Sequence, residues 1–344
     1  MSRPLIYLDN ASTSLKTEKF KKVLEESYED LSWLDRKEEH LESLLFQLSS
    51  YLGVERECIS LVPSSSYAIN EIWGKLLDQK RDWKIHLPRG DHISNLASAE
   101  YLFRGQISYY SPTDLGIENL DLTDDSVLLV TVKDNLGLSF ISLETLKKVR
   151  KRYPEALLIG DLTQYVSSSV EREEIFRIFD YSYLSAHKWY GPFGVGVFID
   201  TLQLCLSGRA EQSCEKRARK CCLDWRAIYV WSQTFSEIIE RSEEFREKAK
   251  NLRSYWEANF PKYGWISWES VPESLIFLVK LRGVNLHDFT FFLEESGFVF
   301  RSSDLCSSNT ALEGPIVRFS LSPLNEVEEL EKLFLIMQKV NSLK

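Results

Sequence analysis

Short apolar runs alternate with amphipathic segments between residues 58 and 200. Helical spacing of the apolar residues predicts helices at 67–77, 92–103 and 143–152. The apolar runs are rich in Ile, Leu, Val and aromatic residues and are bounded by turn-forming residues, which predicts strands. These runs are 58–62, 83–87, 107–110, 126–132, 156–160, 179–184 and 195–199. Near-continuous apolar strands that alternate with helices are typical of an α/β fold, with a mostly parallel sheet covered on both faces.

The segments on either side of this pattern predict a second, smaller lobe. Residues 5–8 read as a short strand, and residues 17–52 as mostly helical with a break near 30–36. Beyond residue 200 we expect a polar, basic loop at 204–222, one long helix at 224–260, strands at 265–270, 274–281, 298–301 and 316–321, and helices at 285–295 and 325–340. We therefore predict a large domain at 15–235 and a small α+β domain at 236–344, which also includes 1–14.

Composition narrows the class of protein. The 344 residues carry a net charge of −9, which argues against a nucleic-acid-binding surface, and the basic run 216–220 fits a solvated loop. No apolar run reaches the roughly 20 residues that a membrane span needs, and we see no secretory signal. Six cysteines are too few for a disulfide scaffold, and those between 205 and 222 lack a paired CxxC motif, so we expect no metal. We expect reduced thiols and a cytoplasmic protein.

Polar groups stand where strands of the large domain end, which is where ligands bind in such sheets. Ser64, Ser65 and Ser66 precede a helix, and they could bind a phosphate or simply cap the helix. Asp161 ends a buried strand and could cap a helix or hold a proton on a heterocyclic nitrogen. Lys188 lies between two apolar strands, on a turn rich in glycine.

These groups together suit one cofactor. A lysine can form an imine with an aldehyde, a carboxylate can keep a ring nitrogen protonated, and a serine-rich helix start can hold a phosphate. A flat aromatic side chain can stack on the ring, and His92, at the start of another helix, could take either this role or a purely structural one. This is the division of labour that pyridoxal 5′-phosphate requires of a protein.

Four segments carry a more specific resemblance, and they occur in the same order as in one known family. They are Tyr7–Thr13, Asp91–Asn95, Gly160–Gln164 and Ser185–Pro192. They resemble the class V aminotransferase family of fold-type I pyridoxal-phosphate enzymes, in particular its cysteine desulfurase/selenocysteine lyase branch. The resemblance implies the PLP-dependent transferase-like fold, with a mostly parallel seven-stranded sheet in the large domain. It also implies roles for cofactor-binding residues: Lys188 as the imine-forming lysine, Asp161 at the ring nitrogen, Gln164 at the phenolic oxygen, His92 on the ring, and Ser65, Ser66, Ser185 and His187 at the phosphate.

The small domain adds two matches. The segment Arg301–Cys306 resembles the loop that presents a nucleophilic cysteine, and Arg318–Leu321 resembles the strand whose arginine binds the substrate carboxylate. The resemblance places Asn10 and Asn135 beside Arg318 at the substrate, although the register leaves Asp134 as an alternative to Asn135. The implied reaction converts L-cysteine to L-alanine, with Lys188 as the proton-transfer base and Cys306 receiving the sulfur as a persulfide. A homodimer and a sulfur-acceptor protein are implied as well.

One segment departs from the family pattern. Cys221 and Cys222 stand where the family usually has a glycine-threonine pair that reaches the partner subunit's cofactor. Two other functions therefore stay open alongside a desulfurase. The first is another reaction of the same cofactor on a different amino acid (transamination, epimerisation or elimination), and the second is a non-catalytic binding protein with this fold.

Overall fold

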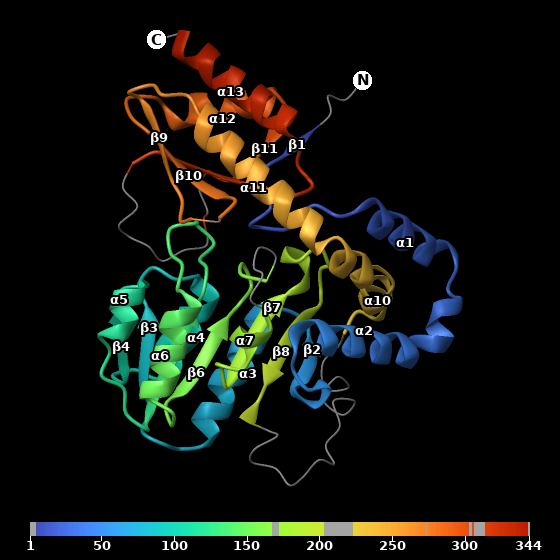
Figure 1. Cartoon of the computed structure of the whole chain (residues 1–344), viewed down its shortest axis with the longest axis vertical. Helices are drawn as coiled ribbons and strands as arrows, with labels where there is room; N and C mark the ends of the chain where they lie inside the picture. Colours follow the sequence, from blue (N-terminus) through green and yellow to red (C-terminus); the bar gives the residue numbers. More distant parts are fainter. Residues whose placement is uncertain are drawn as a thin grey trace.

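A seven-stranded sheet forms the centre of the larger of two lobes (Figure 1). The computed structural model describes residues 5–166, 172–202, 223–272, 274–302, 305 and 314–342. The strands of the sheet are β2 (Ile59–Val62), β3 (Lys84–Pro88), β4 (Ile107–Tyr110), β5 (Ser126–Thr131), β6 (Leu157–Asp161), β7 (Tyr181–Ser185) and β8 (Gly196–Asp200). Their order is β2-β8-β7-β6-β5-β3-β4. Only β8 runs antiparallel to its neighbours, so the predicted mostly parallel sheet is confirmed.

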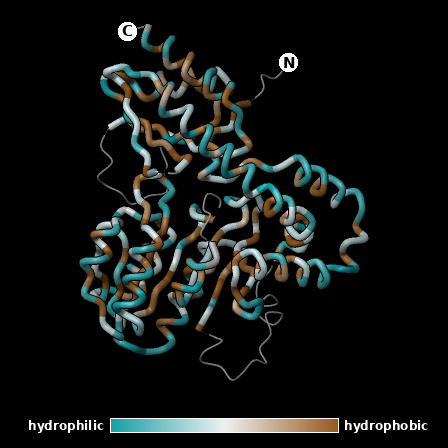
Figure 2. Tube along the Cα trace, in the orientation of Figure 1, coloured by the Kyte–Doolittle hydropathy of each residue, from teal (hydrophilic) through white to brown (hydrophobic). Residues whose placement is uncertain are grey.

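Helices bury both faces of this sheet, as its apolar strands require. Along β5, Val127 and Leu129 face one apolar core, and Leu128 and Val130 face another. The first core includes α3 (Ser65–Asp78) and α4 (Ile93–Leu102), and the second includes α2 (Lys37–Leu52), α6 (Leu143–Arg152) and α10 (Trp225–Glu240). Figure 2 shows the hydrophobic strands enclosed by helices with hydrophilic outer faces.

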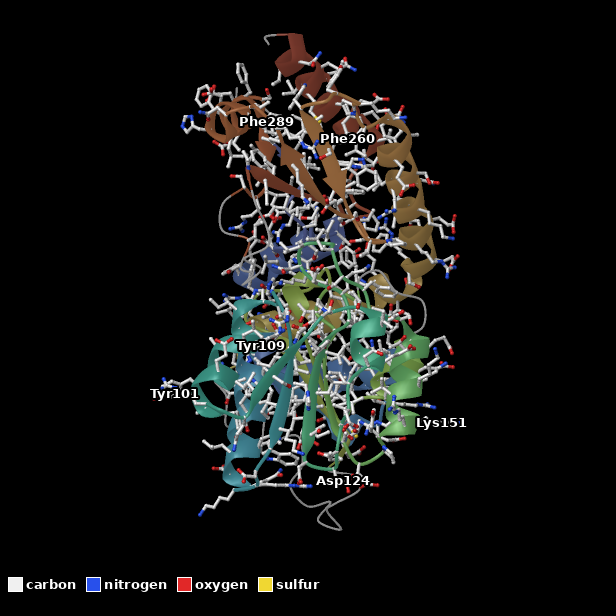
Figure 3. The ribbon with its side chains drawn as sticks, turned by 90° about the vertical axis from the view of Figure 1, so that its left-hand side faces the viewer. Tyr101, Tyr109, Asp124, Lys151, Phe260 and Phe289 are labelled. Carbon is white, nitrogen blue, oxygen red and sulfur yellow. The ribbon has the colours of Figure 1, made fainter. Side chains whose placement is uncertain are left out.

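The direction of the parallel strands decides where a ligand can bind. Asp124, just before β5, is labelled in Figure 3 at the end of the large lobe away from the small lobe. The carboxyl ends of the parallel strands therefore point toward the small lobe.

Short helices α5 (Asp114–Glu118) and α7 (Arg172–Phe176) lie in the loops between strands, and α1 (Glu18–Glu29) with the 3-10 turn Ser32–Arg36 precedes α2. That turn confirms the predicted break near residues 30–36.

The small lobe is built on an antiparallel sheet of β9 (Ile266–Glu269), β10 (Ile276–Leu281) and β12 (Ile316–Ser320). The N-terminal strand β1 (Ile6–Tyr7) pairs in parallel with β11 (Phe298–Val299), and Ile6 and Leu8 join the apolar core of this lobe. Helices α11 (Ser242–Asn259), α12 (Leu286–Glu295) and α13 (Val327–Ser342) complete the lobe. Phe260 and Phe289, labelled in Figure 3, belong to the same core.

The single long helix predicted at 224–260 is wrong, because the structure divides it into α10 and α11 at Arg241. The apolar residues of α10, such as Phe235, pack in the core of the large lobe. The helix α11 begins in that same core at Phe245 and then enters the core of the small lobe with Leu252 and Trp256. The Arg241 guanidinium bridges the break by binding Glu237 and Glu244.

Candidate functional site

Lys188 lies in a 3-10 turn (Ala186–Lys188) that connects β7 to β8 at the carboxyl edge of the sheet. The N-terminal segment holds this turn in place. The carbonyl oxygen of His187 accepts hydrogen bonds from the backbone N–H of Ser14 (2.9 Å) and the Nζ of Lys16 (3.0 Å). Gly191 follows closely, where a Cβ atom would lie 2.9 Å from both the Ala186 side chain and the Trp231 ring. The lysine is thus presented on a turn fixed from both sides.

Two serines meet beside this turn, and we call Ser65 and Ser185 the serine cradle. The Ser185 hydroxyl donates to Ser65 Oγ at 2.8 Å and lies 3.1 Å from the Ser65 backbone N–H, which donates to it. Ser64 is the residue that caps α3, because its hydroxyl accepts from the backbone N–H of Tyr67 at 3.1 Å. The Ser65 hydroxyl is therefore not the group that caps α3. An N–H and two hydroxyls at the start of a long helix are chemically suited to an anion.

Asp161 occupies the last position of β6 and is buried. One of its oxygens accepts from the Thr163 backbone N–H at 2.9 Å, and the other accepts from Asn95 Nδ2 at 2.8 Å. The same amide nitrogen lies 3.0 Å from Asp91 Oδ2. Burial, and secondarily the nearby charge of Asp161, raises the pKa of Asp91 to about 7.

His92 begins α4 and caps it with its own ring. Its Nδ1 accepts from the backbone N–H of Ser94 at 3.2 Å and lies 2.6 Å from the Ser94 hydroxyl. Since Nδ1 accepts from that N–H, we assign the ring proton to Nε2. The orientation of the ring is set by these two contacts.

These side chains line one hollow. Its walls include Ser65, His92, Asp161, Gln164 and Lys188, five of the residues predicted from the sequence. The hollow has a volume of about 20 Å³, and it shares Lys133, Gln164 and Lys188 with a larger cavity of about 640 Å³ that extends to α11 in the small lobe. Thr163 also lines the hollow, and its hydroxyl is buried without a hydrogen-bond partner in the described part of the chain.

Three of the four predicted phosphate ligands, Ser66, Ser185 and His187, do not line this hollow, although Ser185 is hydrogen-bonded to Ser65, which does. Ser66 uses its carbonyl oxygen to accept from Asn70, and its hydroxyl is not among the groups around Lys188. His187 stacks on Phe193 with ring centroids 4.9 Å apart. Burial, with smaller contributions from Lys188 and Lys16, lowers the pKa of His187 to about 4. A neutral His187 at physiological pH would offer a phosphate no positive charge.

Arg318, on β12, is buried and paired with a carboxylate of its own chain. Its Nη2 donates to Asp9 Oδ1 at 2.6 Å and to Ser12 Oγ at 2.9 Å, and its Nη1 donates to the Asn135 carbonyl oxygen at 3.0 Å. Arg301 also donates to Asp9, from Nη2 at 3.1 Å. The Nε of Arg318 is buried with no hydrogen-bond partner among the residues described.

The two asparagines predicted at the substrate lie at different edges of the site. Asn10 lines the larger cavity, and its amide group ties the N-terminal segment to the small lobe through Ser320 and Asn325. Asn135 lines the hollow, and its Nδ2 donates to the carbonyl oxygen of Leu305 at 2.7 Å. Leu305 is the residue before Cys306. Cys306 itself, and the segment with Cys221 and Cys222, lie outside the described residues.

Comparison with known proteins gives the fold a name. The NifS-like protein from Rickettsia africae ESF-5 superposes with a TM-score of 0.80, with 98% of this chain and 100% of that chain covered at 18% identity. The cysteine desulfurase CsdA from Escherichia coli gives a TM-score of 0.81, with 98% and 95% covered at 16% identity. The chain has the cysteine desulfurase fold.

Sequence similarity agrees with this fold. A cysteine desulfurase from Wigglesworthia glossinidia brevipalpis is 22% identical over 351 aligned positions, which cover 88% of this chain and 84% of that protein. No family model matches the sequence. The resemblance to cysteine desulfurases that the motifs predict is thus confirmed by both sequence and structure.

The structure adds residues to the site that the sequence reasoning did not select. Asp91, Asn95, Thr131 and Lys133 are all buried beside the predicted ones. A signal for two of them was present, since Asp91 and Asn95 begin and end the segment around His92 that carries part of the family resemblance. Within the described residues, no helix is long and apolar enough to cross a bilayer, and no three acidic, histidine or cysteine side chains cluster as a metal site.

Proposed function

We propose that this protein is a pyridoxal-phosphate-dependent cysteine desulfurase. The observation that carries the proposal is that Lys188, Asp161 and Gln164 line one hollow together with Ser65 and His92. The donor set fits the cofactor: an amine for its aldehyde, a carboxylate for its ring nitrogen, and an anion site for its phosphate. The unpartnered Thr163 hydroxyl adds a buried polar group for a ligand to satisfy.

When bound, this cofactor withdraws electrons from the substrate's Cα and so weakens the bond between Cβ and sulfur. The chain's own residues do the rest. The serine cradle holds the phosphate, Asp161 keeps the ring nitrogen protonated, and His92 stacks on the ring. Lys188 binds the aldehyde before substrate arrives and then moves a proton at the substrate's Cα.

The substrate carboxylate is assigned to Arg318, whose Nε has no partner among the described residues. Cys306 is assigned as the sulfur acceptor from its place in the segment Arg301–Cys306; the residue before it, Leu305, accepts a hydrogen bond from Asn135, which lines the hollow. The Cys306 thiolate attacks the substrate sulfur, the Cβ–S bond breaks, and a proton replaces sulfur on Cβ, so L-alanine leaves and Cys306 keeps a persulfide. A thiol of an acceptor protein then takes the sulfur. This chemistry requires reduced thiols, and we therefore propose a cytoplasmic location. We propose a homodimer from the family resemblance alone.

The test is product formation from L-cysteine by purified variants. We expect alanine and sulfide from the native chain in the presence of a thiol, and neither product from Cys306→Ser although that variant stays yellow. Lys188→Ala should lose both colour and products, while Lys148→Ala, an exposed lysine on α6, should behave as the native chain does. Turnover of another amino acid that survives Cys306→Ser would instead indicate a different reaction on the same cofactor.

A further inference from the structure

Asn95 is a fully buried side chain that the proposed function does not use. Its Nδ2 donates to Asp161 Oδ2 at 2.8 Å and to Asp91 Oδ2 at 3.0 Å. Its Oδ1 accepts from the Tyr183 hydroxyl at 2.8 Å. A carboxylate only accepts hydrogen bonds, so the amide nitrogen must face the two acids. The Tyr183 hydroxyl then fixes the other end of the amide.

We propose that Asn95 is a positioning residue that aims the Asp161 carboxylate at the cofactor's ring nitrogen. The proposal rests on the proposed function and goes beyond it by naming what controls Asp161. Asp161 has one oxygen held by the Thr163 N–H and the other held by Asn95, so the carboxylate cannot rotate without losing a hydrogen bond. A group that is held in its bound geometry before the ligand arrives binds that ligand more tightly.

Asp91 extends this control to a second cofactor contact. Its Oδ2 accepts from Asn95 and from the Thr131 hydroxyl at 2.8 Å, and its Oδ1 accepts from the backbone N–H of His92 at 2.7 Å. A single amide therefore links the carboxylate assigned to the ring nitrogen with the start of the helix that carries the stacking histidine. The spacing between these two groups is set by Asn95.

The test compares Asn95→Leu with Asn259→Leu in the holoenzyme. Leucine has a similar size to asparagine, and its side chain makes no hydrogen bonds. Asn259 is an exposed residue of α11 whose side chain donates to the Tyr255 carbonyl oxygen of the same helix, so the same substitution there leaves both oxygens of Asp161 held. Two quantities are measured: the dissociation constant of pyridoxal 5′-phosphate, and the ¹⁵N NMR shift of cofactor labelled at the ring nitrogen. Loss of a hydrogen bond to a charged group predicts about tenfold weaker binding in Asn95→Leu, ~1.4 kcal/mol. Its ring-nitrogen signal should move toward the unprotonated position, and Asn259→Leu should keep the native signal.

The ring-nitrogen signal separates positioning from a general loss of structure. A native signal and native affinity in folded Asn95→Leu would overturn the proposal. If Asn95→Leu does not fold, Tyr183→Phe takes its place, because it frees the far end of the amide, and the same shift is expected. If the native chain binds no cofactor, the proposed function fails and this inference with it. If the native chain binds the cofactor and the variants match it, only this inference fails.

Discussion

Two arginines of the small lobe, Arg301 and Arg318, donate hydrogen bonds to the same carboxylate, that of Asp9. Arg318 donates to its Oδ1 at 2.6 Å, and Arg301 donates to its Oδ2 at 3.1 and 3.3 Å. The Asp9 side chain is 7% exposed and that of Arg318 is 3% exposed. We predict that Asp9→Asn, which keeps the shape and removes the charge, destabilises the small lobe strongly.

The magnitude follows from burial. Removing one partner of a buried ion pair costs about 3–5 kcal/mol, because the other charge stays buried without compensation. The asparagine oxygen can still accept a hydrogen bond, which retains roughly 1 kcal/mol. The expected loss in the free energy of unfolding is therefore about 2–4 kcal/mol. Glu39→Gln is the matched control, since Glu39 pairs with Arg36 on the surface with both side chains well exposed, and water already screens that pair.

Urea unfolding followed by tryptophan fluorescence measures both variants, because Trp256 and Trp265 lie in the core of the small lobe beside the N-terminal strand. We expect a clearly lower transition midpoint for Asp9→Asn and a midpoint near the native value for Glu39→Gln. Equal midpoints for the two variants would refute the reasoning, because they would mean that Arg318 loses nothing when its buried counter-charge is removed.

Three further predictions concern the large lobe. In Gly196→Ala, the new Cβ would lie 2.8 Å from the Leu184 oxygen and 3.0 Å from the Ser64 carbonyl carbon. The serine cradle would therefore be displaced, which should weaken cofactor binding. The free energy of unfolding, measured by urea titration, should fall by about 1–3 kcal/mol. The pKa of Asp91 is 3.8 in the unfolded chain and about 7 in the native state, so between these pH values the native carboxyl is protonated and the unfolded one is not. As pH rises through this window, the free energy of unfolding therefore falls by up to about 1.4 kcal/mol per pH unit because of this group. Unfolding at several pH values should show that Asp91→Asn removes this slope, and an unchanged slope would contradict the assignment. Arg150→Met removes contacts to one carboxylate and three carbonyls far from Lys188, so it should lower stability and leave the cofactor dissociation constant unchanged.

The sequence predicts the sheet well because its strands are apolar on both faces and can be buried only in the centre of an α/β fold. The six residues of β5 are all buried, and a short run that is apolar on both faces fits the centre of an α/β sheet far better than any surface position. The division between α10 and α11 is different in kind. Their combined segment has helical spacing throughout, and the passage of α11 from the large-lobe core at Phe245 to the small-lobe core at Leu252 depends on lobes that only the folded chain creates.

The candidate site divides in the same way. Lys188, Asp161 and Ser65 follow from the rule that strand ends of a parallel sheet meet at one edge. The role of Ser64 as the cap of α3, which leaves Ser65 for a ligand, depends on side-chain geometry that a run of three serines does not reveal. The contact between Asn95 and Asp161 joins residues 66 positions apart, so local sequence spacing carries no sign of it.

Arg318 shows how the assembled site changes the meaning of a residue that the sequence identifies. An arginine on a small-lobe strand suggests an empty fork for a carboxylate, yet Asp9 and the Asn135 carbonyl already occupy two of its nitrogens. Arg301 and Arg318 together carry two positive charges against the one negative charge of Asp9, which leaves a net charge of +1 at this corner of the site. Under the proposed function, that surplus attracts the substrate carboxylate, and the donor left for it is the Arg318 Nε, which has no hydrogen-bond partner among the described residues. Asp9 therefore holds Arg318 in place and leaves one positive charge at this corner uncompensated.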